Sequence, residues 1–238
     1  MLTVNDSMPW SAGHLGGFTE EFMQDGSWLC ELLKPYGISL VSDQTAQILS
    51  YLSLLTQWNQ HVNLVSAASL EVWVRRHFVE SLYLSRAVVL EGRLIDIGSG
   101  AGFPALPLKI IFPRLKVTLL EPIGKKRAFL KEVCRACDLG DVEVRSERIE
   151  EFDPGNSIYN IATSRAVGHF QMLVPRMIEF LEEGGWVFLW VSARQEAEIP
   201  SASKSVVWKE PIRIPATEGS QICWGIRKSP PSPGESSG

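Results

Sequence analysis

The chain has 238 residues, of which 45% are hydrophobic and 21% charged, and its formal net charge is −4. A chain of this length and apolar content can bury a large core, which excludes a disordered or fibrous protein. The acidic balance argues against a general nucleic-acid coat protein, although basic residues outnumber acidic ones over residues 61–148.

Location and redox state follow from what the sequence lacks. No apolar run approaches the roughly 20 residues needed to cross a bilayer, and the start, with Asn5 and Asp6, lacks the basic region of a secretion signal. We therefore expect a cytoplasmic protein.

Four cysteines are too few for a disulfide framework. Cys134 and Cys137 form a C-x-x-C within a helical pattern, which favours two buried helix residues over a zinc or redox site, and we expect no metal.

The first third of the chain has helical periodicity. Residues 1–17 show little periodicity and are expected to be a loosely ordered extension, followed by a helical region over 18–90. A first helix ends near Gly37, and Ser42 or Asp43 caps a second with apolar residues at i, i+3 and i+4 spacing. A third is expected from about Ser69 to Val89.

From Arg93 onward, strand and helix patterns alternate. The expected strands are 93–97, 116–120, 142–146, 158–163 and 186–191, and the expected helices are 104–112, 124–137 and 169–181. This alternation predicts an α/β fold with a mostly parallel sheet. Two later apolar runs, 205–208 and 221–226, have no helix between them and predict an antiparallel pair at the sheet edge, making seven strands. We place the core at 91–229, followed by a disordered Pro/Ser/Gly tail at 230–238.

The most informative segment is the first expected strand and the turn after it. Asp96 lies near the strand end, and Gly98, Gly100 and Gly102 follow at every second position. Glycine accepts positive φ and has no Cβ, so such a turn lets the backbone approach a nucleoside cofactor. Glu121 ends the next strand, where an acid binds ribose hydroxyls in a doubly wound sheet.

The spacing of the glycines separates the candidate cofactors. A dinucleotide site requires G-x-G-x-x-G, and this turn does not provide the third glycine at that position. An acid in the strand, together with the acid on the next strand, favours S-adenosyl-L-methionine over NAD. Glu150 or Glu151, just past the expected strand 142–146, is placed to bind the adenine amino group, with a surface Glu pair as the alternative.

Several motifs, in this order and spacing, resemble the bacterial small-subunit (16S) ribosomal RNA guanine-N7 methyltransferase G family, also called GidB. The resemblance extends over roughly residues 30–200. It is carried by Trp58-Asn59, Asn63-Leu64-Val65-Ser66, Arg76-His77, Glu80-Ser81, Asp96 to Pro104, Pro107-Leu108, Leu119-Leu120-Glu121, Gly124-Lys125, Arg127 to Leu130, Arg148 to Phe152 and Ser164-Arg165-Ala166.

This resemblance implies a class I S-adenosylmethionine-dependent methyltransferase fold, Rossmann-like, with an N-terminal helical extension. It also implies cofactor contacts at Gly98, Phe103, Ile149, Glu150 and Arg165, with Glu121 near the ribose. The implied activity is transfer of a methyl group to N7 of a guanine in 16S ribosomal RNA. The implied partner is that RNA or the small ribosomal subunit, and we expect a monomer that binds neither DNA nor a membrane.

Basic residues in the middle of the chain are candidates for RNA contact. Arg75, Arg76 and His77 form one group, and Lys125, Lys126 and Arg127 form another; together they predict a phosphate-facing surface. The alternative is solvated helix faces, and for His77 it is packing against the core. Arg165 is the candidate for positioning at the reaction centre, with a buried structural ion pair as its alternative.

The sequence has neither the Asn/Asp-Pro-Pro-aromatic motif used on exocyclic amines nor the Pro-Cys nucleophile used for cytosine C5, which fits methylation of a ring nitrogen. Guanine N7 has a lone pair and no proton to lose, so its methylation needs placement and no general base. Two other functions stay open. One is the same fold acting on a small molecule or protein. The other is a ribosome-associated RNA-binding module without catalysis, suggested by Val191-Ser192 where the family favours Lys-Gly. An NAD dehydrogenase ranks last, because the glycine spacing is wrong.

Overall fold

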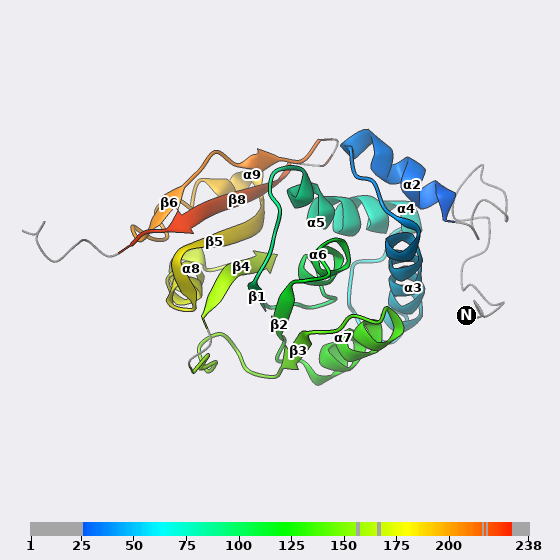
Figure 1. Ribbon diagram of the computed structural model, residues 1–238, viewed down its shortest axis with the longest axis horizontal. Helices are drawn as coiled ribbons and strands as arrows, with labels where there is room; N and C mark the ends of the chain where they lie inside the picture. The colour runs from blue at the N-terminus through cyan, green and yellow to red at the C-terminus, as the bar shows by residue number, and fades with distance from the viewer. Residues whose placement is uncertain (1–25, 156–157, 166–167, 216, 218, 230–238) are drawn as a thin grey trace, which may run out of the picture.

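A twisted sheet runs through the middle of the molecule (Figure 1). The computed structural model describes residues 26–155, 158–165, 168–215, 217 and 219–229. The strands are β1 (Arg93–Ile97), β2 (Lys116–Leu120), β3 (Val142–Arg145), β4 (Tyr159–Arg165), β5 (Leu181–Ser192), β6 (Val206–Trp208), β7 (Ile212–Arg213) and β8 (Ser220–Arg227).

The order of the strands is β3-β2-β1-β4-β5-β8-β6, and β7 pairs with β8 outside this path. Strands β3, β2, β1, β4 and β5 pair in parallel, whereas β8 is antiparallel to β5, β6 and β7. The carboxyl ends of the parallel strands therefore meet at one edge. The strand order reverses beside β1, where ligands bind in open α/β sheets.

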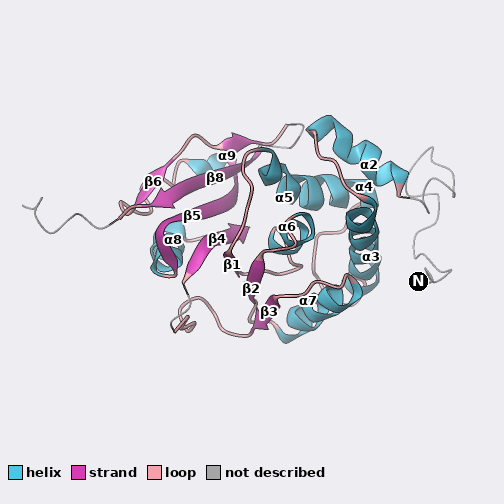
Figure 2. Cartoon of the chain, viewed as in Figure 1, coloured by secondary structure: helices cyan, strands magenta, loops and turns pink. Residues whose placement is uncertain are grey.

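Helices cover both faces of the sheet (Figure 2). They are α2 (Ser27–Leu33), η2 (Lys34–Tyr36), α3 (Ser42–Asn59), α4 (Leu70–Trp73), η3 (Val74–Val79), α5 (Glu80–Leu82), η4 (Tyr83–Arg86), α6 (Ala105–Ile111), α7 (Gly124–Ala136), α8 (Phe170–Glu179) and α9 (Ala193–Glu196). Figure 1 shows α3, α6 and α7 on one side of the sheet and α8 on the other. None of the described helices is both long and apolar enough to span a bilayer.

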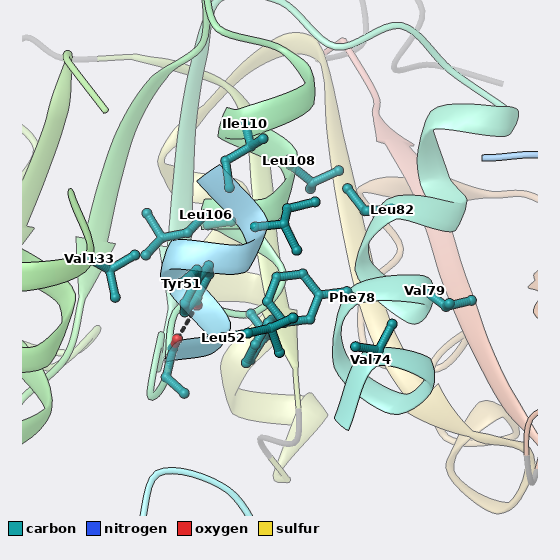
Figure 3. Close-up of a cluster of buried hydrophobic side chains, with 14 of the residues drawn as sticks. Tyr51, Leu52, Val74, Phe78, Val79, Leu82, Leu106, Leu108, Ile110 and Val133 are labelled. Atoms are coloured by element: carbon teal, nitrogen blue, oxygen red, sulfur yellow. Dashed lines mark hydrogen bonds between the residues drawn. The ribbon is translucent and has the colours of Figure 1, made fainter. Parts of the chain in front are cut away.

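Successive side chains of the central strands point to opposite faces of the sheet and belong to two separate hydrophobic clusters. Leu94 belongs to the cluster formed with the N-terminal helices, and Ile95 to the one formed with α8. Such alternation follows from the two-residue period of a strand. The first cluster joins α3 and η3 to α6 and α7, and Tyr51, Phe78 and Leu106 meet in it (Figure 3). The N-terminal helices therefore pack directly onto the elements that carry the glycine turn.

The expected α/β architecture is confirmed, with differences in detail. The expected helix 69–89 is four short pieces, α4, η3, α5 and η4, because the backbone widens to a π-helical turn at Val74–Val79 and tightens again at Tyr83–Arg86. The expected edge pair is present as β6 and β8. The short elements β7 and α9 were not predicted, and with β7 the sheet has eight strands among the described residues instead of the expected seven.

The remaining expectations are only partly covered by the described residues. The extension 1–17, the tail 230–238 and the start of the first expected helix lie outside them. Cys137 is buried at the end of α7, but Cys134 is only half-buried. Across the described ranges, no group of three or more His, Cys, Asp or Glu side chains is placed to hold a metal ion.

Candidate active site

The glycine turn lies at the carboxyl end of β1 and is held against β2. The backbone N–H groups of Gly98 and Ser99 donate to the carbonyl oxygen of Leu120, at 3.0 and 3.1 Å. Gly98, Gly100 and Gly102 all have positive φ, as the sequence pattern predicted. At Gly102, φ is +93° and an added Cβ would lie 2.6 Å from both Leu106 Cδ1 and the Tyr51 hydroxyl. No other residue type fits this position without displacing its neighbours.

Glu121 connects the end of β2 to the same turn. Its side chain is buried, and its two oxygens accept hydrogen bonds from the N–H groups of Gly100 and Ile123, both at 2.8 Å. A carboxylate binding backbone N–H groups in this way fixes the turn as a rigid unit. Glu121 and the glycine turn are therefore in direct contact, as their positions at neighbouring strand ends indicated. Each carboxylate oxygen keeps a lone pair for a further donor.

Asp96 lies beneath the turn and is almost completely buried. Its Oδ1 accepts a hydrogen bond from Thr163 Oγ1 at 2.6 Å, whereas Oδ2 is buried and has no partner among the described residues. Burial raises the pKa of Asp96 to about 7, and the charge of Glu121 adds to this effect, while hydrogen bonds from Thr163 and Ser99 oppose it. An unpartnered buried carboxylate oxygen is costly unless a ligand donor completes it.

Phe103 ends the turn within an aromatic stack. Its ring lies 5.4 Å from that of Tyr51 and 4.9 Å from that of His77, with interplanar angles of 6° and 20°. Burial lowers the pKa of His77 to about 3, and the charges of Arg165 and Arg76 contribute. His77 is therefore neutral and packs on Phe103. This packing against the core is the alternative that the sequence analysis gave to a phosphate contact.

A cavity of about 270 Å³ opens beside the turn, at the ends of β1 and β2. Three residues that were predicted to contact the cofactor line this cavity: Gly98, Ile149 and Glu150. Its remaining lining residues are Ile97, Leu120, Pro122, Glu147, Arg148, Gly168, His169, Met172 and Leu173. None of these nine was predicted as a site residue. The last four lie at the start of α8, which follows β4 at the same sheet edge, and that position in the strand and helix pattern was the signal for them.

Arg165 is the last residue of β4 and forms a buried ion pair with Glu80. Its Nη2 donates to Glu80 Oε2 at 2.7 Å and to the carbonyl oxygen of Arg76 at 2.5 Å, and its Nη1 is buried without a partner among the described residues. Ser220 Oγ donates to the other Glu80 oxygen at 2.8 Å. Burial raises the pKa of Glu80, and the Arg165 charge opposes this. Arg165 thus lies at the carboxyl end of β4 and forms the buried ion pair named as its alternative, and its role at the reaction centre stays a prediction.

A second, larger cavity of about 440 Å³ lies at the ends of β4 and β5. Its lining residues are Val72, Arg75, Arg76, Glu80, Arg165, Trp190, Val191, Ser192, Gln195, Thr217 and Ser220. Residues from α4, η3 and α5 thus form one wall, and the strand ends form the other.

The two basic groups occupy different places. Arg75 donates to Glu71 and to the Tyr36 hydroxyl, both at 3.0 Å, and with Arg76 it lines the larger cavity. Lys125, Lys126 and Arg127 lie in the first turn of α7, outside the lining of both cavities. Arg127 donates to the carbonyl oxygens of Glu121 and Pro122, at 3.0 and 2.6 Å. The structure therefore holds Arg75 and Arg127 in local contacts and leaves Lys125 exposed.

Solved structures that superpose on this chain include methyltransferases. A predicted O-methyltransferase from Agrobacterium tumefaciens gives a TM-score of 0.53 at 18% identity, covering 64% of this chain and 80% of the other. A tRNA (m1A58) methyltransferase from Aquifex aeolicus gives a TM-score of 0.54 at 15% identity, covering 64% and 69%. The chain thus has the Rossmann-like fold of S-adenosylmethionine-dependent methyltransferases.

Sequence comparison assigns the family within that class. Residues 44–221 match the family described as GidB, rRNA small subunit methyltransferase G. The chain belongs to this family, which confirms the resemblance seen in its motifs. Ribosomal RNA small subunit methyltransferase G of Chloroflexus aggregans is 38% identical over 218 residues, covering 86% of this chain and 90% of the relative. The protein of that name from Roseiflexus castenholzii is 37% identical over 204 residues, covering 80% and 86%.

Proposed function

We propose that this protein transfers a methyl group from S-adenosyl-L-methionine to N7 of a guanine in the 16S ribosomal RNA of the small ribosomal subunit. The observation that carries the proposal is the pairing of two buried carboxylates, Asp96 and Glu121, with a glycine turn at the strand-order reversal of a methyltransferase fold. Family membership supports the class of RNA substrate.

The residues at the turn fit the cofactor. Asp96 Oδ2 is a buried acceptor without a partner among the described residues, and Glu121 retains lone pairs beside the turn. At Gly100, the nearest atom to an added Cβ is 3.8 Å away, so the backbone is open to a ligand there. We propose that Glu121 accepts hydrogen bonds from ribose hydroxyls and that Ile149 and Glu150 border the adenine. Gly98 lines the same cavity, and Gly102 and Phe103, which pack against Tyr51, hold the turn in the conformation that the proposed cofactor contacts require.

The methyl donor supplies an electrophilic methyl group on a sulfonium centre. The acceptor N7 needs no deprotonation, so the residues of this chain act by placing it in line with that methyl group. Arg165 stands at the end of β4 and lines the larger cavity, and we propose that it positions the reacting groups beside the cofactor. Glu80 holds the guanidinium in place. Arg76, Lys125 and Lys126 contribute positive charge toward RNA phosphates.

The test has two parts. Isothermal titration should show binding of S-adenosyl-L-methionine by the purified protein, and small subunits from cells lacking the gene should regain one N7-methylguanine when incubated with protein and cofactor. Cofactor binding without any methyl transfer would select the RNA-binding module. Methyl transfer to other acceptors, with ribosomal RNA left unmodified, would select a different substrate class.

We further propose that the protein is cytoplasmic and monomeric, and that its methyltransferase core spans residues 91–229.

A further inference from the structure

His77 contacts the glycine turn through the aromatic residue at the end of that turn. Its ring lies 4.9 Å from that of Phe103, at an interplanar angle of 20°. Phe103 also stacks on Tyr51 and meets Phe78 edge-on, at 5.4 and 5.1 Å between centroids. Tyr51, Phe78 and Phe103 are buried, whereas His77 is half-buried. His77 is therefore the member of this group of four rings that lies closest to solvent.

The helical turn that carries His77 also holds Arg165. The Nη2 group of Arg165 donates to the carbonyl oxygen of Arg76, at 2.5 Å, and to Glu80 Oε2, at 2.7 Å. Arg76 directly precedes His77, and Glu80 follows it three positions later, where η3 passes into α5. Residues three and four positions apart are neighbours on a helix surface. Phe103 and Arg165 are therefore both held by this one turn.

The same turn is tied to the sheet at Glu80. Trp190 Nε1, on β5, donates to the carbonyl oxygen of Glu80 at 2.7 Å, and Ser220 Oγ, on β8, donates to Glu80 Oε1 at 2.8 Å. The backbone just before it, Val74–Val79, is π-helical, a rare conformation that is frequent at functional sites. The position of the turn is thus set on one side by the sheet and on the other by the contact with Phe103.

The charge state of His77 suits packing better than phosphate binding. Burial lowers its pKa to about 3, and the charges of Arg165 and Arg76 add to this effect, so the imidazole is neutral at physiological pH. A neutral ring stacks on Phe103 without repelling the nearby guanidinium of Arg165. A charge-assisted hydrogen bond to a phosphate would need the cationic form. The geometry and the charge therefore both favour a role within the protein over a contact with RNA.

We propose that His77 is a positioning residue for methyl transfer, whose ring fixes Arg165 relative to the glycine turn. This inference rests on the proposed function, in which the methyl donor binds at that turn and Arg165 positions the reacting groups. Catalysis by placement is sensitive to small displacements, since a shift of about 1 Å can lower a rate about 100-fold. His77 acts through Phe103 and Arg165 and touches neither reactant.

Two substitutions separate the stacking of the ring from the filling of space. His77→Leu fills most of the space without a planar ring, whereas His77→Phe keeps the ring without a titratable group. With saturating cofactor and unmethylated small subunits in a single turnover, we expect His77→Leu to lower the rate constant of methyl transfer at least about 10-fold and His77→Phe to restore it. The cofactor Kd and the steady-state KM for subunits should stay unchanged. His61 is exposed just after α3, so His61→Leu is the matched control.

A double-mutant cycle tests whether His77 acts through Arg165. Arg165→Lys removes the planar fork that binds Arg76 and Glu80, so His77→Leu should then have little further effect on the rate constant. Effects that multiply in the double variant would show two independent contributions and overturn the inference, as would a wild-type rate in Arg165→Lys alone. Thermal unfolding measures any loss of stability, which a merely structural role would produce without this non-additivity.

The remaining outcomes separate this inference from the proposed function. A wild-type rate in His77→Leu, with active wild-type protein, would overturn the positioning role and leave the proposed function standing. A raised KM in both His77 variants, with the slope of log KM against log salt concentration reduced by about 1, would assign His77 to an RNA phosphate and also overturn that role. Failure of the wild-type protein to bind S-adenosyl-L-methionine or to methylate subunits would overturn both.

Discussion

The ring of Tyr51, on α3, lies parallel to that of Phe103 in the glycine turn, with 5.4 Å between centroids. The Tyr51 hydroxyl also donates a hydrogen bond to the carbonyl oxygen of Ala101 and occupies the space where a Cβ of Gly102 would lie. One completely buried side chain thus contacts three successive residues of the turn. The N-terminal helices are therefore part of the structure that shapes the candidate cofactor pocket.

Tyr51→Phe should weaken both the fold and the pocket. The aromatic packing is retained, but the buried Ala101 carbonyl loses its donor, which costs about 1–3 kcal/mol of unfolding free energy. Burial keeps the Tyr51 pKa well above its ordinary value, so the hydroxyl donates at all neutral pH values. Urea denaturation and cofactor titration measure the two effects. Tyr83→Phe is the control, and equal behaviour of the two variants would contradict the role assigned to the Tyr51 hydroxyl.

Gly102→Ala should be strongly destabilising. The new Cβ would meet Leu106 Cδ1 and the Tyr51 hydroxyl at 2.6 Å, in a backbone conformation with φ +93° that favours glycine. We expect a loss of at least about 2 kcal/mol in unfolding free energy and of cofactor binding. At Gly140, no atom lies within 4 Å of an added Cβ, so Gly140→Ala provides a matched control. Comparable stability of both variants in thermal unfolding would refute the argument.

Sequence periodicity and local pattern predicted most of this architecture. The strands β1, β2, β3 and β4 were located within about two residues, because buried parallel strands are short apolar runs followed by helical periodicity. The turn, with Asp96 and Glu121, followed from glycine spacing. The four pieces between Leu70 and Arg86 were not predictable, because their apolar spacing still resembles one helix.

Long-range contacts were the part that the sequence could not show. Glu80 and Arg165 are 85 positions apart, and both were noted in the sequence, but nothing local indicated that they form a pair. Tyr51 occupies an ordinary place in the buried face of α3, so its contact with the turn, 50 positions away, left no signal. The cavity between η3 and β5 likewise depends on packing between distant segments.

Glu121→Gln should reduce cofactor affinity while the fold is largely kept. The amide presents one N–H₂ group where a carboxylate oxygen now accepts from Gly100 or Ile123, so one backbone donor loses its partner. We expect Kd for S-adenosyl-L-methionine to rise at least about 10-fold, corresponding to ~1.4 kcal/mol. Glu91→Gln, at an exposed position before β1, should leave Kd unchanged. An unaltered Kd in Glu121→Gln would disprove the ribose contact proposed for this residue.

Asp96 should make the stability of the protein depend on pH in an unusual direction. Its pKa is 3.8 when unperturbed and about 7 in the folded protein, chiefly because of burial. Between these values the folded state binds a proton that the unfolded state does not, so the stability contributed by Asp96 falls as the pH rises from about 4 to 7. His77 acts in the opposite direction. Its pKa is lowered to about 3, so its contribution is lost as the pH falls from 6.5 toward 3.

The variant Asp96→Asn isolates the first of these two effects, because His77 titrates in both proteins. The unfolding free energy of the variant minus that of wild type should increase with pH between about 4 and 7, with a slope of up to ~1.4 kcal/mol per pH unit, and level off outside this range. The amide adds a constant offset that does not change the slope. Urea denaturation at several pH values from 4 to 8 measures the difference. A difference that is flat, or that decreases with pH, would mean that Asp96 is already ionised in the folded protein and that burial does not control its charge.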